Sequence, residues 1–346
     1  MSKLIASLGL NLQFTFATAD RAKQDSFCSS TPVHFIEVGR SACGRLHISV
    51  IQTFCEMVCD AIEACPETPI VLCMEDKNFT TKRNACTLCG AYLLLFEDSD
   101  IHRVTEEFAN ASGQGGSHAC RYITDDVLSC WRALERARAL RWLGPQADGG
   151  DPVLDVEMAA HYARPANGGV HVLVPGRLLL SPPPHALPPG EDWADPPEPA
   201  APGRAGGRVF AAGFLADLLA DLGATAAVCL GRADEGDAAA LRERGLDVHG
   251  LGLAGRRPAL LGAMDRLLSV SRAAAPGAVA LFPPRAAAPG GGGECATAAV
   301  AGWVETLATA LLMTECGFGG GAAAAWVRMV CPDLPEAAGP GRAPGP

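Results

Sequence analysis

Residues 277–302 read G-A-V-A-L-F-P-P-R-A-A-A-P-G-G-G-G-E-C-A-T-A-A-V-A-G. The apolar run Gly277–Phe282 is typical of a short buried strand, and the pattern of Glu305–Cys316 predicts a helix, so a loop joins the two. A strand, a loop and a helix start are the usual place for an anion cradle. The first amides of a helix have no partner inside it, and the helix dipole favours negative charge there.

The loop after this strand is poorly equipped to hold an anion. Pro283, Pro284 and Pro289 have no N–H group to donate. The four glycines 290–293 must also be ordered at ~1–2 kcal/mol each before they can hold a ligand. Arg285 is the remaining cation near the strand end, and we take it as a phosphate-binding candidate.

Length and composition indicate a folded α/β protein. The 346 residues suit two domains of ordinary size, and 49% apolar residues can form a core in each. A formal net charge of −10 argues against unspecific nucleic-acid binding, which needs clustered Lys and Arg, and makes basic partners more natural. No apolar run is long enough to span a membrane. We therefore expect neither nucleic acid nor membrane among the partners.

The first twenty residues allow two interpretations. Lys3, the apolar run Leu4–Leu12 and the small residues 17–19 resemble a cleavable signal peptide. In residues 12–16, however, Leu and Phe alternate with Gln and Thr, which is strand periodicity and interrupts the apolar run. We favour the strand and an intracellular location, in the cytoplasm or nucleus, with secretion as the alternative.

The first half of the chain repeats the plan of strand, loop and helix. A helix over residues 46–65 is followed by a buried strand at Ile70–Met74 and by a helix at Ala85–Phe96. Lys82 and Arg83 lie beside the start of that last helix, and we take both as phosphate-binding candidates. The alternative is a solvated basic cap.

Most of the fourteen cysteines lie in apolar patterns, so we expect reduced core residues. Cys86 and Cys89 form a C-x-x-C pair. The chain has no second such pair and no matching His pair, so we expect no metal site and no cofactor.

The second half alternates helices and strands as an α/β domain does. Residues 144–176, with a helix at Asp155–Arg164, form the expected linker. The Pro- and Gly-rich residues 182–208 predict a mobile surface insertion, and residues 336–346 a disordered tail. The other expected elements are helices at Phe210–Leu222, Ala238–Arg244 and Ala259–Ala274, and strands at Ala224–Leu230 and Leu246–Leu253.

Short segments spaced along the chain carry a further signal. They are L-Q-F-T-F-A-T-A-D-R (Leu12–Arg21), K-R-N-A-C-T-L-C-G-A-Y (Lys82–Tyr92), D-V-E-M-A-A-H-Y and V-P-G-R-L within Asp155–Leu178, and A-A-W-V-R-M-V-C-P (Ala324–Pro332). In this order they resemble the cell-division-cycle-fourteen family of dual-specificity protein phosphatases. The resemblance implies two tandem phosphatase-like domains, each a central sheet flanked by helices, joined by a linker helix. Residues 1–143 would form a non-catalytic domain and residues 177–335 the second domain.

The resemblance also assigns chemistry to positions that this sequence does not keep. A phosphatase of this kind needs a cysteine thiolate, an arginine that grips the phosphoryl oxygens and an acid that protonates the leaving group. The family pattern His-Cys-x-x-Gly-x-x-Arg places Phe282 at the His, Pro283 at the Cys and Pro289 at the Arg. Its acid turn places Ala254 at the Asp. We therefore expect no catalytic residue at these positions.

Two other cysteines, Cys295 and Cys130, are alternative candidates for the nucleophile. A shifted register brings Cys295 to the Cys position but puts Ala301 at the Arg position and removes the internal glycines, so Cys295 is a weak alternative nucleophile. Cys130 and Arg136 have the required spacing, but they lie in the helical pattern of Val127–Leu143, which has no glycine. We expect neither cysteine to be catalytic.

The function favoured by these patterns is that of a catalytically inactive phosphatase homologue, which binds or scaffolds a phosphoprotein or another protein in cell division. One alternative is an active tyrosine and serine/threonine phosphatase whose catalytic loop is missing from this translation, since A-A-A-P-G-G-G-G resembles mis-spliced GC-rich sequence. Another is a structural role, for example at centrosomes or basal bodies. A Cys-x-x-Gly-x-x-Arg segment in the mature transcript would favour the active enzyme.

An acidic cluster after the helix at Ala85–Phe96 bears on the partner. The family groove has an acidic wall, and here Glu97, Asp98 and Asp100 are acidic, whereas Ile101 and His102 follow where acids are expected. Recognition of a basic peptide is therefore in doubt, and the alternative is a solvated helix start.

Overall fold

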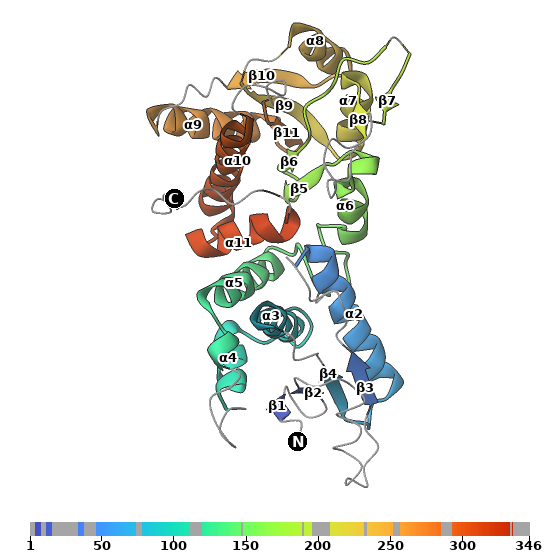
Figure 1. Cartoon of the computed structure of the whole chain (residues 1–346), viewed down its shortest axis with the longest axis vertical. Helices are drawn as coiled ribbons and strands as arrows, with labels where there is room; N and C mark the ends of the chain where they lie inside the picture. Colours follow the sequence, from blue (N-terminus) through green and yellow to red (C-terminus); the bar gives the residue numbers. More distant parts are fainter. Residues whose placement is uncertain are drawn as a thin grey trace. The chain divides into compact units, whose positions relative to one another are not determined.

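The computed structural model describes residues 4–7, 12–15, 34–37, 46–73, 78–110, 120–146, 148–188, 190–195, 208–231, 234–251, 257–284, 293–332 and 334. The protein is α/β, with a mixed central sheet flanked by helices (Figure 1). The chain divides into two compact units, unit 1 (Met1–Pro152) and unit 2 (Val153–Pro346). The division falls inside the segment 144–176, and the expected tail at 336–346 lies outside the described residues.

The sheet of unit 1 has the order β1-β2-β4-β3, formed by Leu4–Ser7, Leu12–Thr15, Ile70–Cys73 and His34–Glu37. β1 is antiparallel to β2, whereas β2 and β3 both run parallel to β4. The strands predicted at Leu12 and Ile70 are confirmed. All residues of β4 are buried, which is typical of a strand with parallel neighbours on both sides.

The helices of unit 1 are α2 (Ile48–Ala64), α3 (Phe79–Leu95), α4 (Ile101–Asn110) and α5 (Asp125–Ala139), with a short 3-10 helix, η3, at Cys120–Tyr122. α3 contacts α2, α4 and α5 (Figure 1), and its residues 84–95 are all buried. A helix that is mostly apolar on every side is stable in such a surrounded position. α3 is thus the central helix of unit 1.

A glycine and a tryptophan bring α3 and α5 close together. A Cβ atom on Gly90 would lie 2.2 Å from the Trp131 ring, so this position requires glycine. The buried Trp131 indole N–H donates a hydrogen bond to the Thr87 carbonyl oxygen at 3.2 Å. Cys130 and Arg136 lie on α5, as the helical periodicity predicts.

The start of α3 differs from the prediction, which began this helix at Ala85. The helix begins at Phe79, because Oδ1 of Asn78 accepts hydrogen bonds from the Thr81 amide at 2.8 Å and from the Thr81 hydroxyl at 3.0 Å. Asn is among the preferred N-cap residues. The polar first turns hid the helix from an analysis based on apolar spacing, so Lys82 lies inside α3 and not beside it.

The sheet of unit 2 has the order β10-β9-β11-β6-β5, formed by Asp247–Leu251, Ala224–Leu230, Ala278–Phe282, Leu178–Leu180 and His171–Val174. β5 is antiparallel to β6, and the other neighbours are parallel. In each unit the antiparallel edge strand pairs with the next strand of the chain, β2 or β6. That strand also pairs, in parallel, with a central strand that comes later in the chain, β4 or β11. β4 in unit 1 and β11 in unit 2 therefore hold equivalent places in their sheets.

The helices of unit 2 are α6 (Val156–Ala163), α7 (Ala212–Asp221), α8 (Glu235–Glu243), α9 (Arg257–Ala274), α10 (Gly293–Cys316) and α11 (Gly320–Val330), with η4 at Pro165–Asn167. α7 and α8 share a core with Ala280 and Phe282 on one face of the sheet, and α9, α10 and α11 cover the other face (Figure 1). The buried Trp326 of α11 donates its indole N–H to the Leu173 carbonyl oxygen at 2.9 Å. In the described part of the chain, no helix is long and apolar enough to span a membrane.

α10 is longer than predicted. The sequence analysis began this helix at Glu305, whereas the structure begins it at Gly293. Residues 296–301 are mostly alanine, the residue with the highest helix propensity, and this explains the earlier start. The connection after β11 is correspondingly shorter than the predicted loop.

The first part of the insertion expected at 182–208 contains a short strand. β7 (Trp193–Ala194) pairs antiparallel with β8 (Val209–Phe210). The Arg208 guanidinium lies over the Trp193 ring, 3.7 Å from its centroid. The few apolar residues of this segment are thus used in contacts that its composition does not reveal. The remainder of the segment lies outside the described residues.

Candidate functional site

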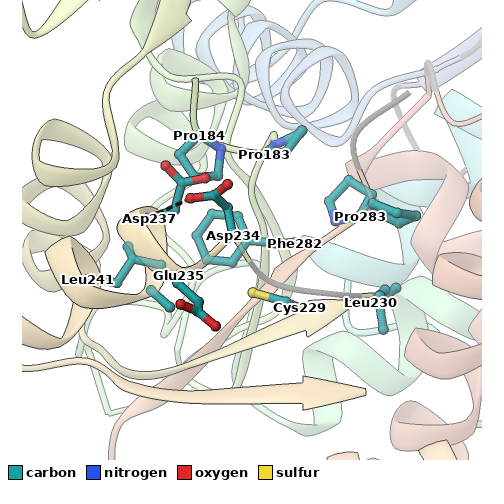
Figure 2. Close-up of a pocket in the computed structure, with 13 residues that line it drawn as sticks. Pro183, Pro184, Cys229, Leu230, Asp234, Glu235, Asp237, Leu241, Phe282 and Pro283 are labelled. Atoms are coloured by element: carbon teal, nitrogen blue, oxygen red, sulfur yellow. Dashed lines mark hydrogen bonds between the residues drawn. The ribbon is translucent and has the colours of Figure 1, made fainter. Parts of the chain in front are cut away.

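The carboxyl ends of β9 and β11 border a crevice of about 660 Å³, the unit 2 crevice (Figure 2). These two strands are adjacent and parallel, yet the helices that follow them, α8 and α10, lie on opposite faces of the sheet (Figure 1). In open α/β sheets, ligands bind outside the carboxyl ends of the strands at such a reversal. The crevice is therefore the first place to look for a site.

The end of β11 places Phe282, Pro283 and Pro284 in the crevice wall. Phe282 is 2% exposed and belongs to the core beneath α7 and α8. A phenyl ring thus stands where the resemblance assigns an imidazole, and Pro283 stands where it assigns a thiol. Neither side chain is a base or a nucleophile, and the two prolines donate no N–H group.

The other positions singled out around this loop have no described side chain. Pro289, Ala254 and Arg285 lie outside the described residues. Cys295 belongs to the first turn of α10, and the structure describes only its backbone.

The end of β9 contributes a thiol, Cys229, to the crevice. Burial, and next the negative charge of Asp237, raise the pKa of this thiol above its ordinary value. A thiol with a raised pKa stays protonated at neutral pH, and the thiolate is the nucleophilic form. Cys229 is therefore unsuited to nucleophilic chemistry.

The start of α8 brings three carboxylates to the crevice, those of Asp234, Glu235 and Asp237 (Figure 2). Oδ1 of Asp234 caps the helix by accepting from the Gly236 amide at 3.0 Å and the Asp237 amide at 3.4 Å. A helix start can hold a phosphate through such amides. Here a carboxylate already takes them, and the neighbouring negative charges oppose a second anion.

The segment Pro183–Pro184 forms another part of the crevice wall. The Ser181 amide donates to the Leu281 carbonyl oxygen at 3.0 Å, and the His185 amide donates to the Phe210 carbonyl oxygen at 2.8 Å. These bonds hold the prolines between β11 and β8. The sequence analysis missed this wall, because it treated the segment as part of a mobile insertion.

The connections after β9 and β11 pack tightly against each other. Gly231 has φ 138°, and its amide donates to the Leu251 carbonyl oxygen at 2.9 Å. A Cβ atom added to Gly231 would lie 3.3 Å from Cβ of Pro284. A side chain at position 231 would therefore be tight against Pro284 and strained by the positive φ.

Unit 1 contains a second cavity, of about 350 Å³, at the start of α3. We call it the α3 pocket. Nζ of Lys82 lies 5.4 Å and Cζ of Arg121 lies 5.0 Å from the centroid of the Tyr122 ring. The Phe79 ring lies 5.4 Å from the same ring, centroid to centroid. Asn78 completes the lining, so the pocket combines aromatic rings with positive charge at a helix start.

The two phosphate-binding candidates of α3 have different surroundings. Lys82 lines the α3 pocket, whereas the Arg83 guanidinium contacts a carboxylate oxygen of Asp126 at 3.0 Å and does not line the pocket. The sequence analysis missed Arg121 and Tyr122, because about forty residues separate them from Lys82 and no local pattern connects the two segments.

The acidic cluster after α3 has partners within unit 1. Glu97 Oε1 accepts from the Tyr92 hydroxyl at 2.7 Å, and Asp98 contacts Arg138 at 3.1 Å. Oδ1 of Asp100 accepts from the Arg103 amide at 2.8 Å, which is a helix-start contact. The alternative interpretation as a helix start thus accounts for Asp100, whereas Glu97 and Asp98 contact side chains of α3 and α5.

Cys86 and Cys89 are both buried in α3 and are not disulfide-bonded. Burial raises the pKa of the Cys89 thiol. Both behave as small apolar residues of the core, as predicted for cysteines in apolar patterns.

The two cavities differ in what they can bind. The described lining of the unit 2 crevice presents carboxylates, prolines and a protonated thiol, whereas the α3 pocket presents two cations and aromatic rings. Compared with models of known protein families and with curated proteins, the chain matches none.

Proposed function

We propose that the chain is a catalytically inactive homologue of dual-specificity protein phosphatases that acts by binding a phosphoprotein or another protein. In this proposal the units are two tandem phosphatase-like domains, with α6 as the linker helix. The proposal is supported by the strand order, which puts a central parallel strand and a following helix at the same place in both sheets. It places the protein in the cytoplasm or nucleus and in cell division.

One observation carries the proposal. At the end of β11, where an enzyme of this kind would hold a phosphoryl group, the chain continues as Phe282-Pro283-Pro284 and faces the carboxylates of Asp234, Glu235 and Asp237. A phosphoryl dianion needs inward N–H groups and a guanidinium there. Three negative charges act in the opposite direction, and loss of a nucleophile alone usually costs several orders of magnitude in rate.

The test is a hydrolysis assay of the purified full chain with an aryl phosphate and with a phosphoserine-proline peptide. We expect release of inorganic phosphate no faster than in buffer, because the described crevice offers neither a nucleophile nor a clamp. Activity that co-purifies with the protein and is lost in Cys295→Ser would overturn the proposal. The same result would favour the active enzyme considered as the alternative.

A further inference from the structure

The α3 pocket is lined by residues of α3 and η3 and by the cap residue Asn78. It is formed at the start of the helix that follows β4, and β4 is the counterpart of β11 in the strand order. α3 has 17 residues, so its dipole makes its first turn favourable for negative charge. A helix start that follows a central parallel strand is a usual place for an anion.

Two cations border the pocket from different segments. Lys82 comes from α3 and Arg121 from η3, and both line one cavity beside the Tyr122 ring. Nη2 of Arg121 donates a hydrogen bond to the Tyr122 hydroxyl at 2.8 Å, which orients the exposed guanidinium. Tyr122 itself is only 3% exposed, so the group that orients Arg121 is fixed in the core of the unit. Two positive charges beside one cavity attract an anion more strongly than either alone.

The pocket also has an apolar side. The Phe79 side chain is 52% exposed although it packs on Tyr122, so much of one large ring remains open to solvent. The cavity volume of about 350 Å³ far exceeds the ~30 Å³ share of one water molecule in the liquid. An inorganic oxyanion alone would leave most of that space to water, whereas an anion carried on an aromatic or aliphatic side chain would use the ring as well.

The charge of the whole chain narrows the ligand class. A net charge of −10 opposes binding of a polyanion such as a nucleic acid, whereas a single phosphoryl group responds mainly to the two cations beside it. A guanidinium and an ammonium are also the groups that bind phosphate in proteins.

We propose that the α3 pocket binds a phosphoryl group carried on a peptide side chain. Lys82 and Arg121 contact the phosphoryl oxygens, and Phe79 packs against the apolar part of the phosphorylated side chain. The proposal rests on the proposed function, since it names the phosphoryl group as what unit 1 recognises while unit 2 performs no hydrolysis.

The test is a phosphorus NMR titration of the full chain with phenyl phosphate, and separately with inorganic phosphate. We expect a saturable broadening of the phenyl phosphate signal, with weaker binding of inorganic phosphate because it cannot use Phe79. Lys82→Gln and Arg121→Gln should each weaken phenyl phosphate binding about tenfold, equivalent to about 1.4 kcal/mol. Phe79→Ala should weaken phenyl phosphate binding and leave inorganic phosphate unchanged.

Arg83→Gln is the matched control. It removes the neighbouring charge of the same helix, but the Arg83 guanidinium contacts Asp126 and does not line the pocket. Binding should stay within about twofold of the unsubstituted chain, and circular dichroism should show that all variants are folded. An equal loss of phenyl phosphate binding in Arg83→Gln would contradict binding in the α3 pocket. Broadening that sodium chloride at equal ionic strength removes completely would contradict it as well.

The same spectra separate this inference from the proposed function. A growing signal of inorganic phosphate during the phenyl phosphate titration would mean hydrolysis and would contradict the inactive homologue. Absence of saturable broadening, with no inorganic phosphate released, would contradict the α3 pocket and leave the inactive homologue standing. Tight binding of inorganic phosphate that is insensitive to Phe79→Ala would mean that the pocket takes free phosphate and not a phosphorylated side chain.

Discussion

The connection from β4 to α3 and the connection from β11 to α10 hold equivalent places in their sheets but create opposite surroundings. The first leads to a helix capped by the neutral Asn78, with Lys82 and Arg121 beside it. The second leaves Phe282 in the core, continues with two prolines, and faces the acidic start of α8. The order of the strands determines where a ligand can approach, and the described residues that line each cavity determine which charge it must carry.

The largest effects should come from the buried tryptophan of each unit. Trp131→Ala in unit 1 and Trp326→Ala in unit 2 should each lower the free energy of unfolding by about 3–5 kcal/mol, because each leaves a large cavity and removes a buried hydrogen bond. Urea unfolding followed by circular dichroism measures the loss.

The pair also tests whether the two places are separate. Trp131→Ala disturbs α3 and α5 and should weaken phenyl phosphate binding. Trp326→Ala should leave this binding unchanged when it is measured without urea, where that variant is folded. Equal loss of binding in both variants would show that the α3 pocket does not belong to unit 1 alone.

A smaller contrast concerns one thiol of each unit. Burial raises the pKa of Cys89 in α3 and, together with Asp237, that of Cys229 in the unit 2 crevice. Because a raised pKa keeps the thiol protonated, alkylation of Cys229 by iodoacetamide should continue to accelerate above pH 9.0, the ordinary thiol value. At a fixed pH, Cys89 should react at least about tenfold more slowly than Cys229, because it is fully enclosed and must wait for local unfolding.

Mass spectrometry of the two cysteine peptides over a pH series measures both rates. In Asp237→Asn the alkylation of Cys229 should shift to lower pH, while Cys89 should be unchanged. Half-maximal alkylation of Cys229 below the ordinary thiol pKa would contradict the protonated thiol and reopen nucleophilic chemistry in the crevice.

The smallest effects should come from the two helix caps. Asn78→Ala and Asp234→Ala each remove a side chain that accepts from amides at a helix start, and each should cost about 1 kcal/mol in the free energy of unfolding. Their consequences for anions should differ in sign. Asn78→Ala disturbs the start of α3 and should weaken phenyl phosphate binding, whereas Asp234→Ala removes a negative charge that opposes anions.

Denaturation curves and the phosphorus titration are measured on the same two variants. Asn78→Ser and Asp234→Ser serve as controls, since Ser is also a preferred cap and should recover most of the stability. Equal effects of both alanine variants on anion binding would mean that the two helix starts do not differ as described.

The sequence predicted most of the elements of the fold but less of the sites. The strand Ala224–Leu230 has the predicted bounds, because a buried strand is an unbroken apolar run. The early turns of α3 and α10 were missed for different reasons, one being polar and capped by Asn78, the other rich in alanine and glycine with no apolar spacing. Lys82 could be named from its helix, whereas Arg121 joins it through tertiary contacts that no local pattern encodes.

The two prolines at the end of β11 limit what a single substitution could add at this place in the sheet. Pro283→Cys would restore a thiol at the end of β11. Pro284 would still follow it, and an added Cβ on Gly231 would lie 3.3 Å from its Cβ. A ring with a locked φ and no N–H in that position prevents the chain from folding into an inward cradle. An anion cradle at the end of β11 would therefore require replacement of both prolines, because neither change alone supplies a thiol and an N–H group together.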